Sequence, residues 1–291
     1  MVLRNAAINR LTGSDIFLKC ENFQKVGAFK MRGASAAVDA LSDEQKYKGI
    51  ATHSSGNHAQ AVALSARLHG IEAHIVMPEN APAIKRMAVE DYGAIIYTSG
   101  NSISDREAKM QEVLDKTGAT FIHPYNDFNV IAGQGTAALE LLKKIPELDI
   151  VMAPVGGGGL LSGTALYCNY HNPTISVYGA EPKLVDDAAR SLKSGRIENN
   201  DRIDTIADGL RTKLGEKTFE IIYRFTDQIL TVEEENIIAA MRLVWERMKI
   251  IIEPSGAVPL GAVLEYPHLF TGKKVGIIIS GGNVDLQELP F

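Results

Sequence analysis

Four consecutive glycines, Gly156 to Gly159, are the residues of this 291-residue sequence with the clearest chemical consequence. They follow an apolar segment, residues 149–155, that predicts a strand, and they precede a segment, residues 160–165, that predicts a helix start. Because glycine has no Cβ, successive backbone N–H groups can converge on one phosphate there. A turn without a ligand is a poor explanation, since each glycine costs roughly 0.5–1 kcal/mol of extra chain entropy.

The same turn nearly matches a dinucleotide-binding fingerprint. Ser162 stands where the third fingerprint glycine belongs, although Gly163 follows it and Glu181 lies about where a ribose-binding acid would be. Phosphate binding is the favoured interpretation. A nicotinamide-dependent oxidoreductase stays open as a remote alternative.

Lys30 is the candidate nucleophile. Most lysines lie on the surface, but Lys30 stands between Phe29 and Met31, and small residues flank this segment on both sides. Such neighbours would desolvate the ammonium group, lower its pKa and favour Schiff-base chemistry.

A polar loop, residues 54–58 with the sequence Ser-Ser-Gly-Asn-His, follows the predicted strand 49–53. One of these side chains is enough to cap the next helix. Hydroxyls and a glycine at a helix N-terminus also suit a substrate carboxylate. His53 and His58 lack a third metal ligand, so a transition-metal site is not expected.

The acidic segment 181–187 places carboxylates on either side of a turn. From the residues alone a solvated loop is favoured, although its oxygen ligands would suit Mg²⁺ or Ca²⁺. A last motif, Ser280-Gly281-Gly282-Asn283, follows the apolar segment 275–279 and puts a hydroxyl at the end of a strand.

The elements that must position these groups alternate between strand and helix, which predicts an α/β fold of parallel βαβ units. The helix 57–69 should bury Ala61, Leu64, Ser65 and Leu68 and stop at Gly70. The predicted strands are residues 49–53, 72–77, 94–98, 120–123, 149–155, 175–181, 226–231 and 274–280.

Two domains with a cleft between them are expected. Residues 49–126 form the small one, which carries the loop for the substrate carboxylate, and residues 1–48 with 127–291 form the large one. Ligands of open α/β sheets bind outside the carboxyl ends of strands, where the polar motifs fall.

Composition excludes several classes of function. The net charge is −5 and no basic run occurs, so neither nucleic acid nor an anionic membrane is an expected partner. No apolar stretch approaches the roughly 20 residues of a membrane span, and no signal peptide is apparent, so a cytoplasmic protein is predicted. Cys20 and Cys168 are far apart, which predicts reduced thiols.

In this order, the motifs resemble the fold-type II pyridoxal-phosphate (PLP) enzymes of the serine/threonine dehydratase and serine racemase family, across essentially the whole chain. The resemblance implies PLP as cofactor and two open, twisted, mostly parallel sheets with helices on both faces. It implies that Lys30 binds the cofactor covalently, that Asn57 lies beside the phenolic oxygen and that Ser280 lies beside the pyridine nitrogen. The implied cofactor-binding residues are Phe29, Lys30, Asn57, Gly156, Gly157, Gly158, Gly159, Glu253 and Ser280. The implied substrate-binding residues are Ser54, Ser55, Gly56, Asn57, His58 and Arg106.

Three features resemble serine racemases and 3-hydroxyaspartate dehydratases more than threonine dehydratases. Ser55 stands where typical threonine dehydratases have alanine, and racemases use a serine there on the face opposite the lysine. Arg106 matches an arginine that reaches the substrate region. Glu181, the Val185 carbonyl and Asp187 match a site for Mg²⁺, Mn²⁺ or Ca²⁺, which reverses the solvated-loop interpretation.

The resemblance therefore implies a serine racemase with L-serine/β-hydroxy amino acid dehydratase (ammonia-lyase) activity. The alternative is a dedicated ammonia-lyase for threo-3-hydroxyaspartate, threonine or serine. A non-catalytic phosphometabolite-binding protein is a third hypothesis.

A small amino-acid substrate and a homodimer are also implied by the resemblance. The family's N-terminal segment, which ends in Thr-Pro just before Val2, is missing from this sequence, which weakens the case for a nucleotide effector and leaves the subunit interface in question. No regulatory domain follows Asn283, so feedback control is not expected.

Overall fold

The computed structural model describes residues 1–81 and 83–291, and the chain divides into two compact units. The first unit comprises Met1–Phe29 and Gln134–Phe291, and the second comprises Lys30–Gly133. The sequence-based boundaries had assigned residues 30–48 to the larger domain. The structure assigns them to the second unit, because α2 (Lys30–Asp39) packs against α4 (Asn57–His69) there.

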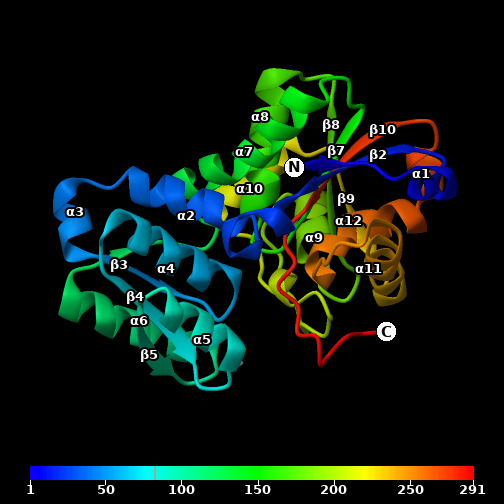
Figure 1. The fold of residues 1–291 in the computed structure, drawn as a ribbon. Helices are drawn as coiled ribbons and strands as arrows, with labels where there is room; N and C mark the ends of the chain where they lie inside the picture. Colours follow the sequence, from blue (N-terminus) through cyan, green and yellow to red (C-terminus); the bar gives the residue numbers. More distant parts are fainter. Residues whose placement is uncertain (82) are drawn as a thin grey trace. The chain divides into compact units, whose positions relative to one another are not determined.

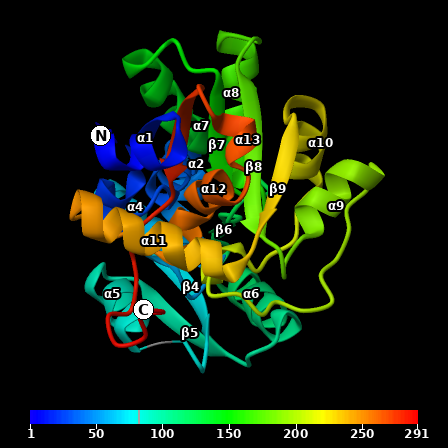
Figure 2. The ribbon, with the colours of Figure 1, turned by 90° about the vertical axis from the view of Figure 1, so that its right-hand side faces the viewer.

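The first unit contains a six-stranded sheet of order β1-β2-β10-β7-β8-β9 (Figures 1 and 2). All neighbouring strands are parallel except β1 and β2, which pair antiparallel. The strands are β1 (Val2–Leu3), β2 (Asp15–Cys20), β7 (Ile150–Pro154), β8 (Ser176–Pro182), β9 (Gln228–Val232) and β10 (Lys274–Ile279).

Helices cover both faces of this sheet, so its central strands are buried throughout. Ile150 and Met152 of β7 face the layer of α11 and α12, whereas Val151 and Ala153 face α7 and α8. The helices are α1 (Ala6–Thr12), α7 (Phe128–Lys144), α8 (Gly159–His171), α9 (Asp187–Ser194), α10 (Glu216–Phe225), α11 (Glu234–Met248), α12 (Pro254–Glu265) and α13 (Pro267–Phe270), with 3₁₀ turns at Glu21–Phe23, Lys25–Gly27 and Asp208–Leu210.

The second unit contains a four-stranded parallel sheet of order β5-β4-β3-β6. Met110 and Val113 of α6 pack on Ala51 and Val76 of the sheet, and α4 also packs on β3 and β4. The strands are β3 (Ile50–His53), β4 (Ala73–Pro78), β5 (Ile95–Ser99) and β6 (Thr120–Phe121), and the remaining helices are α3 (Asp43–Lys48), α5 (Ala83–Asp91) and α6 (Ile103–Thr117).

These elements confirm the predicted α/β class with two mainly parallel sheets. All eight predicted strands are present, although β6 is shorter than expected. Helix α4 has the predicted limits, and Gly70 ends it with a left-handed φ of 67°. The expectation for Leu68 was wrong: it is 55% exposed, because the last turn of α4 emerges from the layers that bury its first turns.

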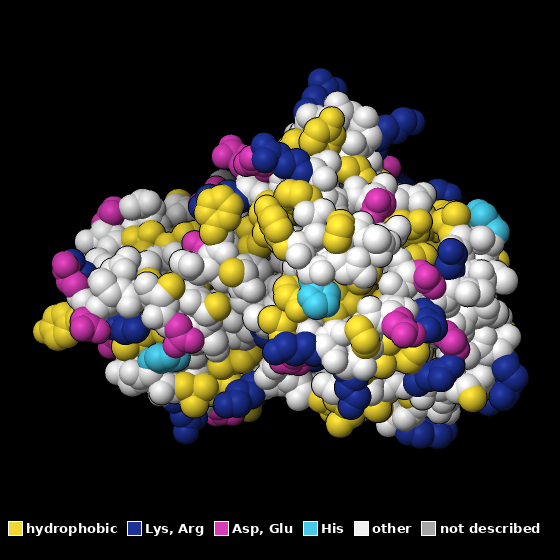
Figure 3. All heavy atoms as spheres, turned by 90° about the horizontal axis from the view of Figure 1, so that it is seen from above, with side chains coloured by type: hydrophobic (Ala, Val, Ile, Leu, Met, Phe, Trp, Pro, Cys, Tyr) yellow, Lys and Arg dark blue, Asp and Glu magenta, His cyan; other side chains and the backbone are white. Residues whose placement is uncertain are grey.

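Charged side chains of both signs are intermixed with apolar ones on the face drawn in Figure 3. Within the described part of the chain, no helix is long and apolar enough to cross a membrane.

Helices α7 and α8 approach closely through a pair of glycines. A Cβ on Gly135 would lie 2.7 Å from the carbonyl oxygen of Gly163, which is backbone and cannot rotate away. This contact fixes α8, the helix that follows the glycine run.

We expect Gly135→Ala to destabilise the protein by about 1–3 kcal/mol, because the added methyl group forces the two helices apart. Denaturant unfolding measures the change. Asn129→Ala, at an exposed position of α7, is the control and should leave stability nearly unchanged. Equal stability of the two variants would show that the close approach is not a constraint.

Candidate active site

The glycine run connects the carboxyl end of β7 to the first turn of α8. Gly158 has a φ of 89°, and a Cβ there would lie within 2.9 Å of Leu214, Thr218 and Ile222. A Cβ on Gly156 would lie 2.9 Å from the Cα of Leu210. Only glycine fits both positions without displacing its neighbours.

The backbone donors of this turn have no protein partner. All four glycines are buried, and no described residue accepts a hydrogen bond from the N–H groups of Gly156, Gly157 or Gly158. Buried N–H groups without an acceptor are rare, and these lie at the positive end of a helix. The turn is therefore suited to an anion such as a phosphate group.

Ser280 and Glu253 lie together at the end of β10, the strand next to β7. Both are buried, and the Ser280 hydroxyl lies 3.5 Å from Oε1 of Glu253. The backbone N–H of Phe29 donates to the carbonyl of Ser280 over 2.9 Å, which brings the residue before Lys30 to this end of the sheet. Phe29, Glu253 and Ser280 thus share the carboxyl edge with the glycine turn.

Glu181 and Asp187 form a buried acidic pair at the same edge, near the end of β8 and the start of α9. The carboxylate of Glu181 accepts hydrogen bonds from the N–H groups of Ala188 and Ala189. That of Asp187 accepts from the Asn200 amide and, over 3.3 Å, from the N–H of Leu214.

Burial raises the pKa of Glu181 well above its usual range and raises the pKa of Asp187 to about 6, because desolvation disfavours the charged carboxylates. The neighbouring charge of Asp187 raises the pKa of Glu181 further. The buried carbonyl oxygen of Val185 accepts no hydrogen bond from a described residue. These two carboxylates and the carbonyl oxygen are hard oxygen ligands of the kind that a divalent cation prefers. The described residues hold no cluster of three or more His, Cys, Asp or Glu side chains, so a cation here would need the Val185 carbonyl as its third protein ligand.

In the second unit, Lys30 is the first residue of α2, and its Nζ donates a 2.7 Å hydrogen bond to the carbonyl of Pro124. His58, in the first turn of α4, is buried, and its Nε2 lies 3.0 Å from the carbonyl of Ile122. Burial and, to a smaller extent, the nearby charge of Lys30 lower the pKa of His58 to about 3. His58 is therefore neutral at physiological pH.

The predicted carboxylate loop lies between β3 and α4, where the Oγ of Ser54 accepts a hydrogen bond from the N–H of Gly56. Ser55 is half-buried, and Asn57 begins α4. Burial lowers the pKa of His53, and the charge of Arg106, a residue of α6, lowers it further.

Sequence reasoning missed Pro124 and its neighbours. His123 and Tyr125 flank it and pack edge to face, with ring centroids 4.7 Å apart. The available signal was their position, since His123 ends the predicted strand 120–123 and Pro124 and Tyr125 follow it directly.

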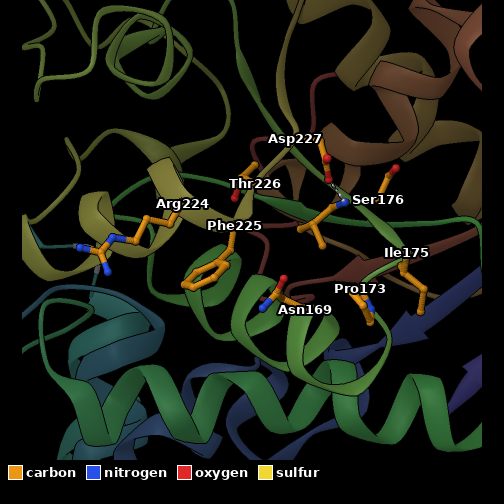
Figure 4. A pocket seen from close by; sticks show the side chains of 9 residues that line it. Asn169, Pro173, Ile175, Ser176, Arg224, Phe225, Thr226 and Asp227 are labelled. Carbon is orange, nitrogen blue, oxygen red and sulfur yellow. Dashed lines mark hydrogen bonds between the residues drawn. The ribbon is translucent and has the colours of Figure 1, made fainter.

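A separate cavity of about 150 Å³ lies at the opposite, amino-terminal edge of the first unit's sheet (Figure 4). Asn169, Arg224 and Thr226 help to line it, and Asp227 accepts a hydrogen bond from the N–H of Val177 over 2.7 Å. None of the predicted site residues borders this cavity.

The fold is that of an α/β protein whose glycine turn, at the carboxyl edge of the larger sheet, is suited to a phosphate-bearing ligand. The family model for pyridoxal-phosphate dependent enzymes matches residues 2–281, and the chain belongs to this family. It is a PLP-dependent enzyme, so the alternative of a nicotinamide-dependent oxidoreductase was wrong.

Within the family of PLP-dependent enzymes, the chain is similar to serine racemases and hydroxyaspartate lyases. The chain is 48% identical to a beta-hydroxyaspartate dehydratase of Paracoccus denitrificans, over 98% of this chain and 90% of that protein. It is 46% identical to an L-threo-3-hydroxyaspartate ammonia-lyase of Saccharomyces cerevisiae, over 99% of this chain and 88% of that protein. The crystal structure of the serine racemase from Dictyostelium discoideum matches with a TM-score of 0.94 and 48% identity, over 98% of this chain and 92% of that one.

Proposed function

We propose that this protein is a serine racemase that also removes water and ammonia from L-serine and related β-hydroxy amino acids. The observation that carries the proposal is the high identity, over nearly the whole chain, to serine racemases and hydroxyaspartate lyases alike. A dedicated threo-3-hydroxyaspartate ammonia-lyase is the second candidate. Arg106 favours it, because a guanidinium group can pair with the second carboxylate of that substrate.

We assign the binding roles by residue. The glycine turn holds the cofactor phosphate, with Phe29, Asn57, Glu253 and Ser280 around the ring. Residues 54–58 and the N-terminus of α4 bind the substrate carboxylate through backbone N–H groups and the helix dipole. Bound PLP supplies an electron sink for the pair left at Cα when the α-proton departs.

Lys30 is assigned the role of base that removes the α-proton. Its amine is held by the Pro124 carbonyl, which shows that the local backbone can orient the amine. His58 is neutral at physiological pH, because its pKa is about 3, so it does not act as an imidazolium acid. Ser55 remains the assigned proton donor for the opposite face.

Lys30→Ala is expected to keep its fold but lose both racemisation and elimination, because the lysine supplies chemistry rather than core packing. Borohydride treatment of the parent enzyme should fix the cofactor to Lys30, and mass spectrometry of the labelled peptide checks this. Substantial turnover by well-folded Lys30→Ala protein contradicts the assignment.

Ser55→Ala separates the two reactions, because inversion needs a proton donor on the second face and elimination does not. The variant should make no D-serine from L-serine while still making pyruvate at a substantial fraction of the parental rate. Both products are followed in one preparation of each protein.

D-serine formation by Ser55→Ala at the parental rate would remove Ser55 from this role. A parent enzyme that makes no D-serine is a dedicated lyase, and 3-hydroxyaspartate is then the substrate to test.

Glu181, Asp187 and the Val185 carbonyl are proposed to hold Mg²⁺, Mn²⁺ or Ca²⁺. A bound cation would offset the cost of burying two carboxylates close together. At a concentration 100 times its Kd, the cation should stabilise the fold by about 2.7 kcal/mol.

Chelation is therefore expected to lower the Tm and the activity together, and each cation should restore both. Asp187→Asn is the matched variant and should not respond to cations. If exhaustive chelation changes neither quantity in the parent, the pair is only a buried acidic cluster.

The cytoplasmic location, the homodimer and the nucleotide effector remain predictions. Size-exclusion chromatography with light scattering tests the oligomeric state.

A further inference from the structure

Thr218, in the first turn of α10, contacts the backbone of the glycine turn. It is fully buried, and its Oγ1 donates to the carbonyl oxygen of Gly157 over 2.8 Å. Oγ1 of Thr218 also accepts a hydrogen bond from the N–H of Gly215 over 2.9 Å, and the Gly215 carbonyl, at 3.0 Å, is a second and slightly more distant acceptor for the hydroxyl. The hydroxyl thus ties the glycine turn to the N-terminus of α10.

This contact sets the direction of a backbone donor. The peptide group between Gly157 and Gly158 is planar and trans, so its C=O and its N–H point in opposite directions. Because the carbonyl points to Thr218, the N–H of Gly158 points away from α10. No described residue accepts a hydrogen bond from that N–H.

The next peptide group is held in a similar way. The Oγ and the backbone N–H of Ser162 both donate to the carbonyl of Gly158, over 2.7 and 2.8 Å. Ser162 Oγ also lies 3.2 Å from the carbonyl of Thr218, which links the two helices around the turn.

A run of four glycines needs such restraint. Glycine adopts positive and negative φ values with similar ease, so an unrestrained peptide in this run could rotate and direct its N–H away from the anion. The position where Gly158 would carry a Cβ lies 2.9 Å from the Cβ of Thr218, so the threonine also limits the turn sterically.

We infer that Thr218 is a positioning residue for the cofactor phosphate: its hydroxyl fixes the Gly157–Gly158 peptide in the orientation that presents the Gly158 N–H to the phosphate. Thr218 acts through the glycine turn and does not touch the cofactor. The inference rests on the proposed assignment of the phosphate to this turn, and it is independent of which amino acid is the substrate.

The test compares PLP with pyridoxal, which has the same ring but no phosphate. Each full-length variant is stripped of cofactor and titrated with both compounds, and fluorescence gives the two dissociation constants. Thr218→Val removes the hydroxyl at nearly constant volume, and Thr218→Ser restores it. Thr164→Val is the matched control, because Thr164 is equally buried in the first unit and its hydroxyl has no hydrogen-bond partner among the described residues.

Thr218→Val should bind PLP about tenfold more weakly and pyridoxal with unchanged affinity, as expected for the loss of a hydrogen bond that contributes about 1.4 kcal/mol. Thr218→Ser and Thr164→Val should both bind PLP within about twofold of the parent. The ³¹P resonance of bound PLP should also shift in Thr218→Val alone.

Equal weakening of PLP and pyridoxal by Thr218→Val would overturn the inference, since that result describes general destabilisation of the site. Unchanged PLP affinity would overturn it as well. Gly158→Ala tests the phosphate assignment separately. If Gly158→Ala weakens the binding of PLP more than that of pyridoxal but Thr218→Val does not, the phosphate assignment stands and only the role of Thr218 is wrong. If Gly158→Ala weakens both equally or neither, the phosphate assignment is wrong, and so is the inference that rests on it.

Discussion

The larger unit is organised around a set of buried N–H groups that need an anionic partner. These donors lie where β7, a central strand, ends and α8 begins, and no described side chain or carbonyl accepts from them. Leaving such donors unpaired in the interior costs about 1–3 kcal/mol each. A phosphate group bound at this turn, as proposed, would therefore stabilise the arrangement of strand, turn and helix.

The two edges of the same sheet differ in how their polar groups are satisfied. The carboxyl edge holds the glycine donors, the crowded carboxylates of Glu181 and Asp187 and the Ser280–Glu253 pair, all of them deeply buried. At the amino edge, Arg224 and Asp227 are exposed, and Asp227 is already bonded to the backbone of β8. The glycine N–H groups without a described acceptor therefore lie where the parallel strands point, as expected for a ligand site in this class of fold.

Local patterns predicted the strands that alternate with helices and missed β1 and β2. Strand β2 contains a buried lysine, which interrupts its apolar pattern. Lys19 is 1% exposed and forms ion pairs with Glu21 and with Glu140 of α7. The pair with Glu140 joins residues far apart in the sequence, so the local sequence does not reveal it. From its residues alone, the acidic segment 181–187 was interpreted as a solvated loop. Its carboxylates are buried, and Asp187 accepts hydrogen bonds from Asn200 and Leu214, which come later in the sequence. Thr218 was not predicted because α8, β8 and α9 lie between it and the glycine run in the sequence.

Leu214 contacts both the acidic pair and the glycine turn. Its N–H donates to Asp187, and its side chain would be 2.8 Å from a Cβ on Gly158. A cation held by the acidic pair and an anion held by the turn, as proposed, would therefore share one structural element, and a preference of one ligand for a position of Leu214 would alter the binding of the other. Thermodynamic reciprocity then requires each ligand to alter the affinity for the other by the same factor.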